Sequence, residues 1–165
     1  MGTGNIARSH AKAIAASEGA ATLVAAMDVD QSQLGSFCAE FEIPVGYGDL
    51  TDMLSQAQPD LVHICTPPST HHPIARACLD SGTSVLVEKP PTISLREFDE
   101  LVAAEGAEGT EGTDGAEDRE GPPWFATVFQ HRFGAAQRHL AALAKSGALG
   151  RPLLALCDTT WFRDQ

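Results

Sequence analysis

The sequence predicts an α/β fold in which a doubly wound parallel sheet is covered by helices on both faces. Short runs rich in apolar and β-branched residues alternate with helical patterns along most of the chain, which is typical of strand–helix–strand units. Two runs, LVHIC at 61–65 and SVLVE at 84–88, are too apolar to have one face in water. A strand with one face in water would alternate, so we expect both runs to be buried and 61–65 to be a central strand.

The individual elements follow from periodicity and from residues that begin or end helices. Residues 5–17 predict a helix, because Ile6, Ala11 and Ile14 fall near one face. Asp49 and Ser94 are expected N-caps, and Gly82 is an expected helix end. The remaining predictions are helices at 31–41, 49–57, 71–80, 94–104 and 134–146, and strands at 22–27, 44–48, 84–88, 124–129 and 153–161.

The totals exclude several classes of partner. Lys plus Arg is 11 and Asp plus Glu is 22, so the net charge is −11, which argues against nucleic acid and anionic membranes. The chain shows neither a signal-like start nor an apolar run of about 18 residues. Its four cysteines are scattered, without metal-ligand spacing. We therefore expect a reduced, cytoplasmic protein with no metal site and no membrane partner.

A glycine motif opens the first predicted helix. Gly2-Thr3-Gly4-Asn5-Ile6-Ala7 matches G-x-G-x-x-A, a pattern that allows a tight turn, a close approach of a pyrophosphate and close helix packing. Asp28 ends the next predicted strand, 24 residues after Gly4. A carboxylate there accepts hydrogen bonds from ribose hydroxyls and repels a 2′-phosphate, so the sequence favours NAD over NADP. Asp30 is close enough to be an alternative, and a solvated acid in a turn is another.

Two further motifs follow the buried strands. Thr66-Pro67-Pro68 comes after 61–65, with His71 starting the next helix, and Glu88-Lys89-Pro90 ends 84–88. Ligands bind at the carboxyl ends of parallel strands. A lysine ammonium there can stabilise the alkoxide that develops during hydride loss. The alternatives are an exposed helix-start histidine and a surface Glu–Lys pair.

Together these motifs resemble the family of glucose–fructose oxidoreductase and inositol dehydrogenase-like proteins, in its N-terminal part. The similarity runs from GTGNIARSHAKAI through TPPSTHH and VLVEKP to FQHRFG. It implies a Rossmann-like NAD(P)-binding domain. It also implies cofactor binding by the glycine-motif residues (Gly2, Gly4, Asn5, Ile6, Ala7), by Asp28, by Thr66, Pro67 and His71, and by Glu88 and Lys89.

The resemblance also implies substrate residues and an activity. Lys89 would touch substrate as the catalytic residue, and His131 and Arg132, in Gln130-His131-Arg132, would reach substrate hydroxyls or anions. The alternatives for His131 and Arg132 are core or surface roles. The family's second domain usually supplies an acid and a histidine that accepts the proton. The expected reaction is hydride transfer between NAD and a secondary alcohol of a sugar, inositol or related polyol. Alternatives are an NAD-dependent glycosidase of the same superfamily and a non-catalytic protein that senses a nucleotide or sugar.

The domain organisation is expected to be incomplete at both ends. Residues 1–149 predict a dinucleotide-binding domain, with an acidic, disordered loop at 105–121, and 150–165 predict the first strand of a second α+β domain. No strand precedes the glycine turn, so we expect 22–27 and 61–65 to lack the partner that belongs between them. The 165-residue chain should therefore show little activity alone, and the full-length protein is expected to be a homo-oligomer.

Overall fold

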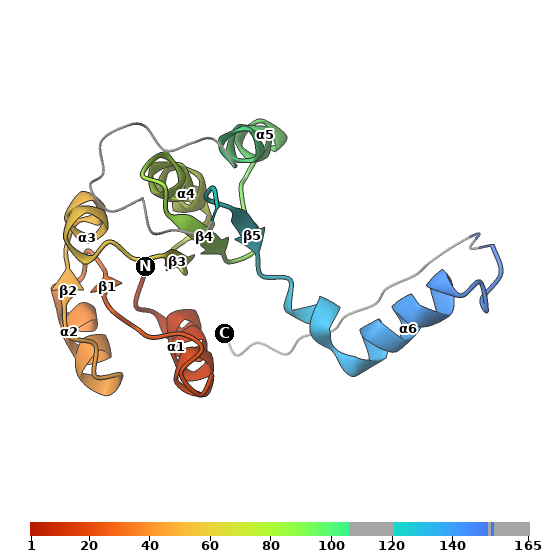
Figure 1. The fold of residues 1–165 in the computed structure, drawn as a ribbon, viewed down its shortest axis with the longest axis horizontal. Helices are drawn as coiled ribbons and strands as arrows, with labels where there is room; N and C mark the ends of the chain where they lie inside the picture. The colour runs from red at the N-terminus through yellow and green to blue at the C-terminus, as the bar shows by residue number, and fades with distance from the viewer. Residues whose placement is uncertain (106–120, 152, 154–165) are drawn as a thin grey trace, which may run out of the picture. The chain divides into compact units, whose positions relative to one another are not determined.

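Helices and parallel strands alternate along the chain in the computed structural model, which describes residues 1–105, 121–151 and 153 (Figure 1). The chain divides into two units, Met1–Val128 and Phe129–Gln165. Among its described residues, the first unit contains five α-helices and five strands: α1 Asn5–Ala15, β1 Ala26–Met27, α2 Gln31–Glu40, β2 Gly46–Tyr47, α3 Leu50–Ala57, β3 Leu61–Ile64, α4 His71–Asp80, β4 Ser84–Val87, α5 Leu95–Ala104 and β5 Phe125–Thr127.

All described strand pairs are parallel, and they form two small sheets. In one sheet β1 pairs with β2, and in the other the order is β3-β4-β5. Ile64 lies opposite Val87, so the residues that follow β3 and β4 leave the sheet at the same level. The doubly wound parallel arrangement predicted from the sequence is confirmed.

Met1 and Gly2 lie between the two sheets. The amino group of Met1 donates to His63 O at 2.8 Å, and Cys65 N–H donates to Met1 O at 2.8 Å. On the other side Gly2 N–H donates to Met27 O at 2.9 Å. These bonds continue the parallel pattern of hydrogen bonding, so this part of the chain links β1 to β3.

Two strand predictions need correction. The strand predicted at 22–27 is confined to Ala26 and Met27, because only this end finds ladder partners. The strand at 61–65, expected to be central, lies at the edge of its three-stranded sheet, where β4 is central. On the other side of β3 the backbone bonds to Met1, so the apolar content of 61–65 overstated how many strands lie beside it.

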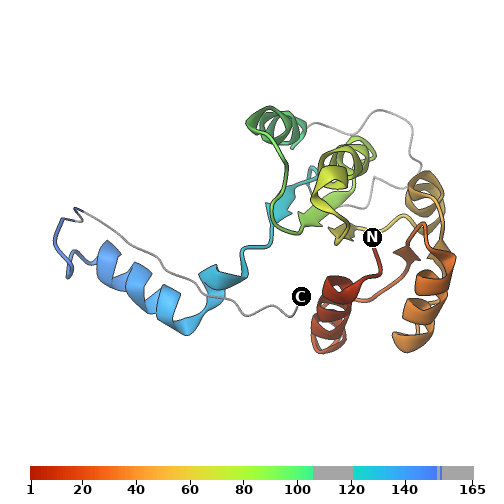
Figure 2. The same cartoon turned by 180° about the vertical axis from the view of Figure 1, so that it is seen from behind.

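Helices cover both faces of the first unit (Figures 1 and 2). Residues of α1 and α2 pack with Ala26 in one apolar cluster. Residues of α3, α4 and α5 pack with Met27, Val62, Ile64, Val85 and Val87 in another. Ala26 and Met27 are neighbours in one strand, so their side chains point to opposite faces and contribute to different clusters.

The predicted helix starts are confirmed by their capping bonds. The carboxylate of Asp49 accepts from Thr51 N–H and Asp52 N–H, and the hydroxyl of Ser94 accepts from Glu97 N–H. Asp30 caps α2 in the same way, through Ser32 N–H and Gln33 N–H. Side-chain acceptors satisfy N–H groups that have no partner inside the helix.

The second unit contains the helix α6, Ala135–Lys145, preceded by a short 3₁₀ helix, Gln130–Phe133. The helix confirms the one predicted at 134–146. The strand predicted at 153–161 and nearly all of the acidic loop predicted at 105–121 lie outside the described residues. The predicted domain boundary near residue 149 stays a prediction.

Candidate cofactor site

The first glycine of the motif is required by the backbone. Gly2 has a φ of +74°, which side-chain-bearing residues rarely adopt. A Cβ at Gly2 would also lie 2.9 Å from Cys65 O. The glycine turn therefore fits tightly against the end of β3, as the sequence predicted for a close turn.

The second glycine faces open space. A Cβ at Gly4 would meet no atom within 4 Å. Gly4 is the N-cap of α1 and makes no side-chain capping bond, while Asn5 and Ile6 beside it are exposed. The first-turn N–H groups and the positive end of the helix dipole thus border an open cradle, an arrangement that suits a phosphate group.

The alanine of the motif is a packing residue. Ala7 is 5% exposed and joins Ala11, Leu34 and Phe37 in one apolar cluster. A small side chain at this position lets α1 approach the sheet closely. The role predicted for the third small residue of the pattern agrees with this packing.

Asp28 lies directly beside the glycine turn. Its Oδ2 accepts from both Thr3 N–H and the Thr3 hydroxyl at 2.7 Å, and its Oδ1 accepts from Asp30 N–H at 3.0 Å. Partial burial alone would raise the pKa of Asp28, but the bonds from Asp30 and Thr3 outweigh it and lower the pKa below its ordinary value. Asp28 is therefore an ionised acceptor next to the turn.

The structure separates Asp28 from its alternative, Asp30. Asp30 is exposed and its carboxylate caps α2, whereas Asp28 contacts the glycine motif. Of the two acids, only Asp28 bonds to the glycine turn. The choice of Asp28 from its spacing is the one that agrees with this geometry.

The loop after β3 and the turn after β4 are joined by His71. Its Nδ1 lies 2.7 Å from Pro90 O and its Nε2 lies 2.8 Å from Thr66 O. The ring is 1% exposed. His71 is therefore buried beneath the loops that contain Thr66, Pro67 and Lys89, and it holds these loops together. Pro67 itself is exposed.

Glu88 and Lys89 differ sharply in exposure. Glu88 is 6% exposed, whereas Lys89 is exposed at the end of β4. Glu88 Oε1 lies 3.1 Å from His10 Nε2, and Glu88 Oε2 accepts from Lys89 N–H at 3.1 Å. Within this pair, the exposed ammonium of Lys89 is the group that can reach a ligand.

Two histidines of this region were missed at the sequence level. His10 Nδ1 lies 3.0 Å from His63 Nδ1, and the rings meet edge to face with centroids 5.1 Å apart. Burial, then the neighbouring His10 and the amino terminus, lower the pKa of His63 to about 4. The contacts join residues 53 and 78 positions apart, so no local pattern could have revealed them.

Gln130, His131 and Arg132 lie in the short 3₁₀ helix of the second unit. The substrate role predicted for His131 and Arg132 therefore stays a prediction. The remaining predicted residues all belong to the first unit. The carboxyl ends of β1, β3 and β4 are followed by Asp28, Thr66 and Glu88, respectively. Gly2 lies in the glycine turn, which bonds to the end of β1.

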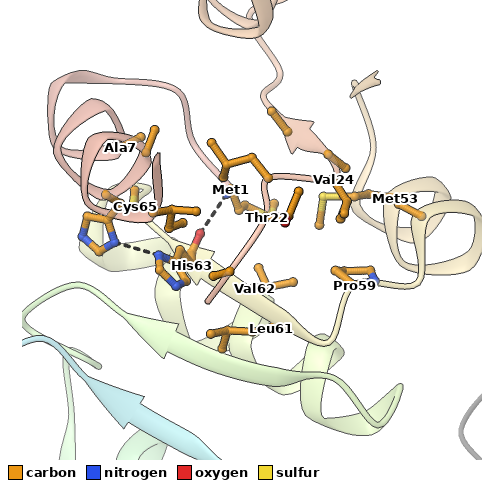
Figure 3. Close-up of a pocket in the computed structure, with 18 of the residues that line it drawn as sticks. Met1, Ala7, Thr22, Val24, Met53, Pro59, Leu61, Val62, His63 and Cys65 are labelled. Carbon is orange, nitrogen blue, oxygen red and sulfur yellow. Dashed lines mark hydrogen bonds between the residues drawn. The ribbon is translucent and has the colours of Figure 1, made fainter. Parts of the chain in front are cut away.

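A cavity of about 380 Å³ lies between the segment that precedes β1 and strand β3 (Figure 3). Figure 3 shows Met1 near its middle, with Ala7 and Cys65 to the left and Val24, Met53 and Pro59 to the right. Gly2 and Ala7 border the cavity, but Asp28, Thr66 and Lys89 are not among its lining residues. Most of the predicted cofactor residues therefore lie outside this cavity.

The described part of the chain offers no candidate for a membrane span or a metal site. None of its helices has the length and apolar character needed to cross a membrane. Within the same residues, no group of three or more His, Cys, Asp or Glu side chains is arranged to hold a metal ion.

The fold and the site together define this chain as a nucleotide-binding α/β domain. The family described as "Oxidoreductase family, NAD-binding Rossmann fold" matches residues 1–111. The chain belongs to this family and contains its NAD-binding fold, and the resemblance found in the sequence is confirmed.

Individual relatives agree with this assignment. Inositol 2-dehydrogenase 1 of Saccharopolyspora erythraea is 27% identical over 95% of this chain and 43% of its own length. The WlbA dehydrogenase of Bordetella pertussis, solved with NADH and UDP-GlcNAcA, is 26% identical with a TM-score of 0.75, over 91% of this chain and 42% of that one. Apo scyllo-inositol dehydrogenase from Lactobacillus casei is 25% identical with a TM-score of 0.75, over 90% and 40%. The chain spans less than half the length of these relatives.

Proposed function

We propose that this chain is the nucleotide-binding part of a dehydrogenase that transfers hydride between NAD and a secondary alcohol of a sugar, inositol or related polyol. The observation that carries the proposal is the open cradle at Gly4, bordered by the α1 N-terminus and lying one residue from Thr3, the partner of Asp28. The names of the relatives, inositol dehydrogenases and a dehydrogenase solved with a nucleotide sugar, support the substrate class.

Each proposed role follows from a group's chemistry. The α1 N-terminus with Gly2, Gly4, Asn5, Ile6 and Ala7 would hold the pyrophosphate, and Asp28 would accept hydrogen bonds from the adenine ribose. A carboxylate has about four lone-pair sites, so the bonds from Thr3 and Asp30 leave it able to accept more. The same negative charge would disfavour the 2′-phosphate of NADP.

Lys89 is the proposed catalytic residue. When bound, NAD accepts the hydride. The Lys89 ammonium would donate a hydrogen bond to the substrate hydroxyl, orient it and stabilise the negative charge that grows on its oxygen. Thr66, Pro67 and His71 would shape the middle of the cofactor site. By the family resemblance, the proton acceptor and the oligomer contacts would come from a second domain.

Calorimetric titration of the 165-residue chain with NAD and with NADP tests the proposal. We expect NAD to bind at least about tenfold more tightly, and Asp28→Asn to lose most of that preference. Asp52→Asn, an exposed acid on α3, is the matched control and should keep it. Absence of NAD binding by a folded chain, or equal affinity for both cofactors, would contradict the proposal.

A further inference from the structure

We propose that His10 is a positioning residue that holds Glu88 and, through it, the turn that presents Lys89. Neither the glycine motif nor the spacing of the later motifs gives His10 a role. The inference rests on the proposed function, because it concerns how the two ends of one cofactor site are kept in register. It adds His10 to that site and gives the buried carboxylate of Glu88 a structural role.

The contact between His10 and Glu88 is well shielded from water. His10 lies on α1, six residues after Gly4, and its Nε2 is 3.1 Å from Glu88 Oε1. The two side chains are 12% and 8% exposed. An ionised carboxylate can only accept a hydrogen bond, so the proton of this contact belongs to His10 Nε2.

The second oxygen of Glu88 carries the contact onward to Lys89. Glu88 Oε2 accepts from the backbone N–H of Lys89 at 3.1 Å. One carboxylate thus joins a side chain of α1 to the main chain of the residue proposed to touch substrate. Without His10, the buried carboxylate would lose a donor and would be drawn toward water, and its bond to Lys89 N–H would be disturbed.

His63 fixes the other side of the His10 ring. The two Nδ1 atoms lie 3.0 Å apart. The pKa of His63 is lowered to about 4, chiefly by burial, so its ring is neutral near pH 7. A neutral His63 can pair with His10 Nδ1 while His10 Nε2 stays turned toward Glu88.

His10 thus links the two parts of the protein that are proposed to bind the two ends of the cofactor. The first turn of α1 borders the cradle at Gly4, and a later turn of the same helix holds Glu88. We therefore expect loss of His10 to weaken contacts at the nicotinamide end while the adenosine and diphosphate contacts persist.

Paired titrations separate these two ends. ADP-ribose lacks the nicotinamide, so we expect it to bind equally to the wild-type chain, to His10→Leu and to His10→Gln. NAD should bind at least about tenfold more weakly to His10→Leu, whereas His10→Gln, whose amide can still donate to Glu88, should recover most of that loss. Lys12→Ala, an exposed change on the same helix, is the control and should match the wild type. NADH fluorescence reports the nicotinamide environment and should change in the same order.

A measurement without ligand judges the inference separately. The backbone amide of Lys89 should exchange its hydrogen at least about tenfold faster in His10→Leu and near the wild-type rate in His10→Gln. Unchanged exchange and unchanged NAD affinity in His10→Leu would overturn the role of His10. An equal loss of NAD and ADP-ribose would also overturn it, because His10 would then only support the fold. If ADP-ribose fails to bind the wild-type chain, the proposed function fails, and Lys89 exchange still decides whether His10 holds the turn.

Discussion

At the scale of single residues, the two glycines of the motif serve different purposes. Gly2 is needed by the fold, since its φ is positive and a Cβ would press against Cys65 O. Gly4 is not confined by the protein, since a Cβ there meets nothing within 4 Å. The sequence pattern treats the two alike, and the surroundings of each glycine distinguish them.

Alanine substitutions should separate these roles. We expect Gly2→Ala to lower the free energy of unfolding by about 1–3 kcal/mol, from strain and the close contact. Gly4→Ala should lower it by no more than about 1 kcal/mol, the cost of alanine at an N-cap, but weaken NAD binding by about tenfold or more. Urea unfolding and calorimetry measure the two effects. A destabilising Gly4→Ala with unchanged affinity would show that the cradle does not face the cofactor.

His63 should make the stability of the fold depend on pH. Its pKa is lowered from 6.5 to about 4, so between these values the unfolded chain binds a proton that the folded chain does not. Stability should therefore fall as the pH drops from about 6.5 toward 4, with a contribution of about 1–3 kcal/mol from this group. Urea unfolding at pH 7 and pH 4.5 should show a smaller loss for His63→Gln than for the wild type. Equal losses would mean that His63 is protonated as easily in the folded chain.

At the scale of elements, the N-caps of α3 and α5 follow directly from sequence, whereas the predicted apolar face of α1 does not, since Ile6 is exposed and Ala7 and Ala11 are the buried residues. Asp49 and Ser94 begin α3 and α5 where the pattern placed them, because a cap needs only local hydrogen bonds. The strands are less local. Residues 22–25 carry a strand-like sequence, yet only Ala26 and Met27 form the strand, since a strand requires a neighbour to supply its hydrogen bonds.

The helix α5 offers a matched test of packing. Leu101 is 0% exposed and belongs to the larger apolar cluster, whereas Leu95 on the same helix is 82% exposed. Leu101→Ala should lower the free energy of unfolding by about 2–5 kcal/mol through lost burial and a residual cavity. Leu95→Ala should change it by less than about 0.5 kcal/mol. Similar losses in the two variants, measured by urea unfolding, would contradict the orientation of this helix.

At the scale of the whole first unit, the site depends on where separate strands end. Gly2 bonds to Met27, Glu88 N–H bonds to Ile64 O, and His71 joins Thr66 to Pro90. These contacts bring three motifs from distant parts of the sequence to one edge. Parallel connections place the carboxyl ends of strands side by side, which is why the motif order in the sequence could anticipate the site.

The sequence by itself determined the parallel α/β class, most helix starts and the glycine turn, and it indicated Asp28 and Lys89 as candidate residues. Each of these depends on local hydrogen bonding, on periodicity or on a motif that can be found in one short stretch. Only the tertiary structure decided that Asp28 and not Asp30 contacts the turn, that His71 lies behind the loops, and that His10 holds Glu88. Those facts depend on side chains that meet across up to 78 positions of sequence, and such meetings are fixed by packing rather than by any neighbouring residue.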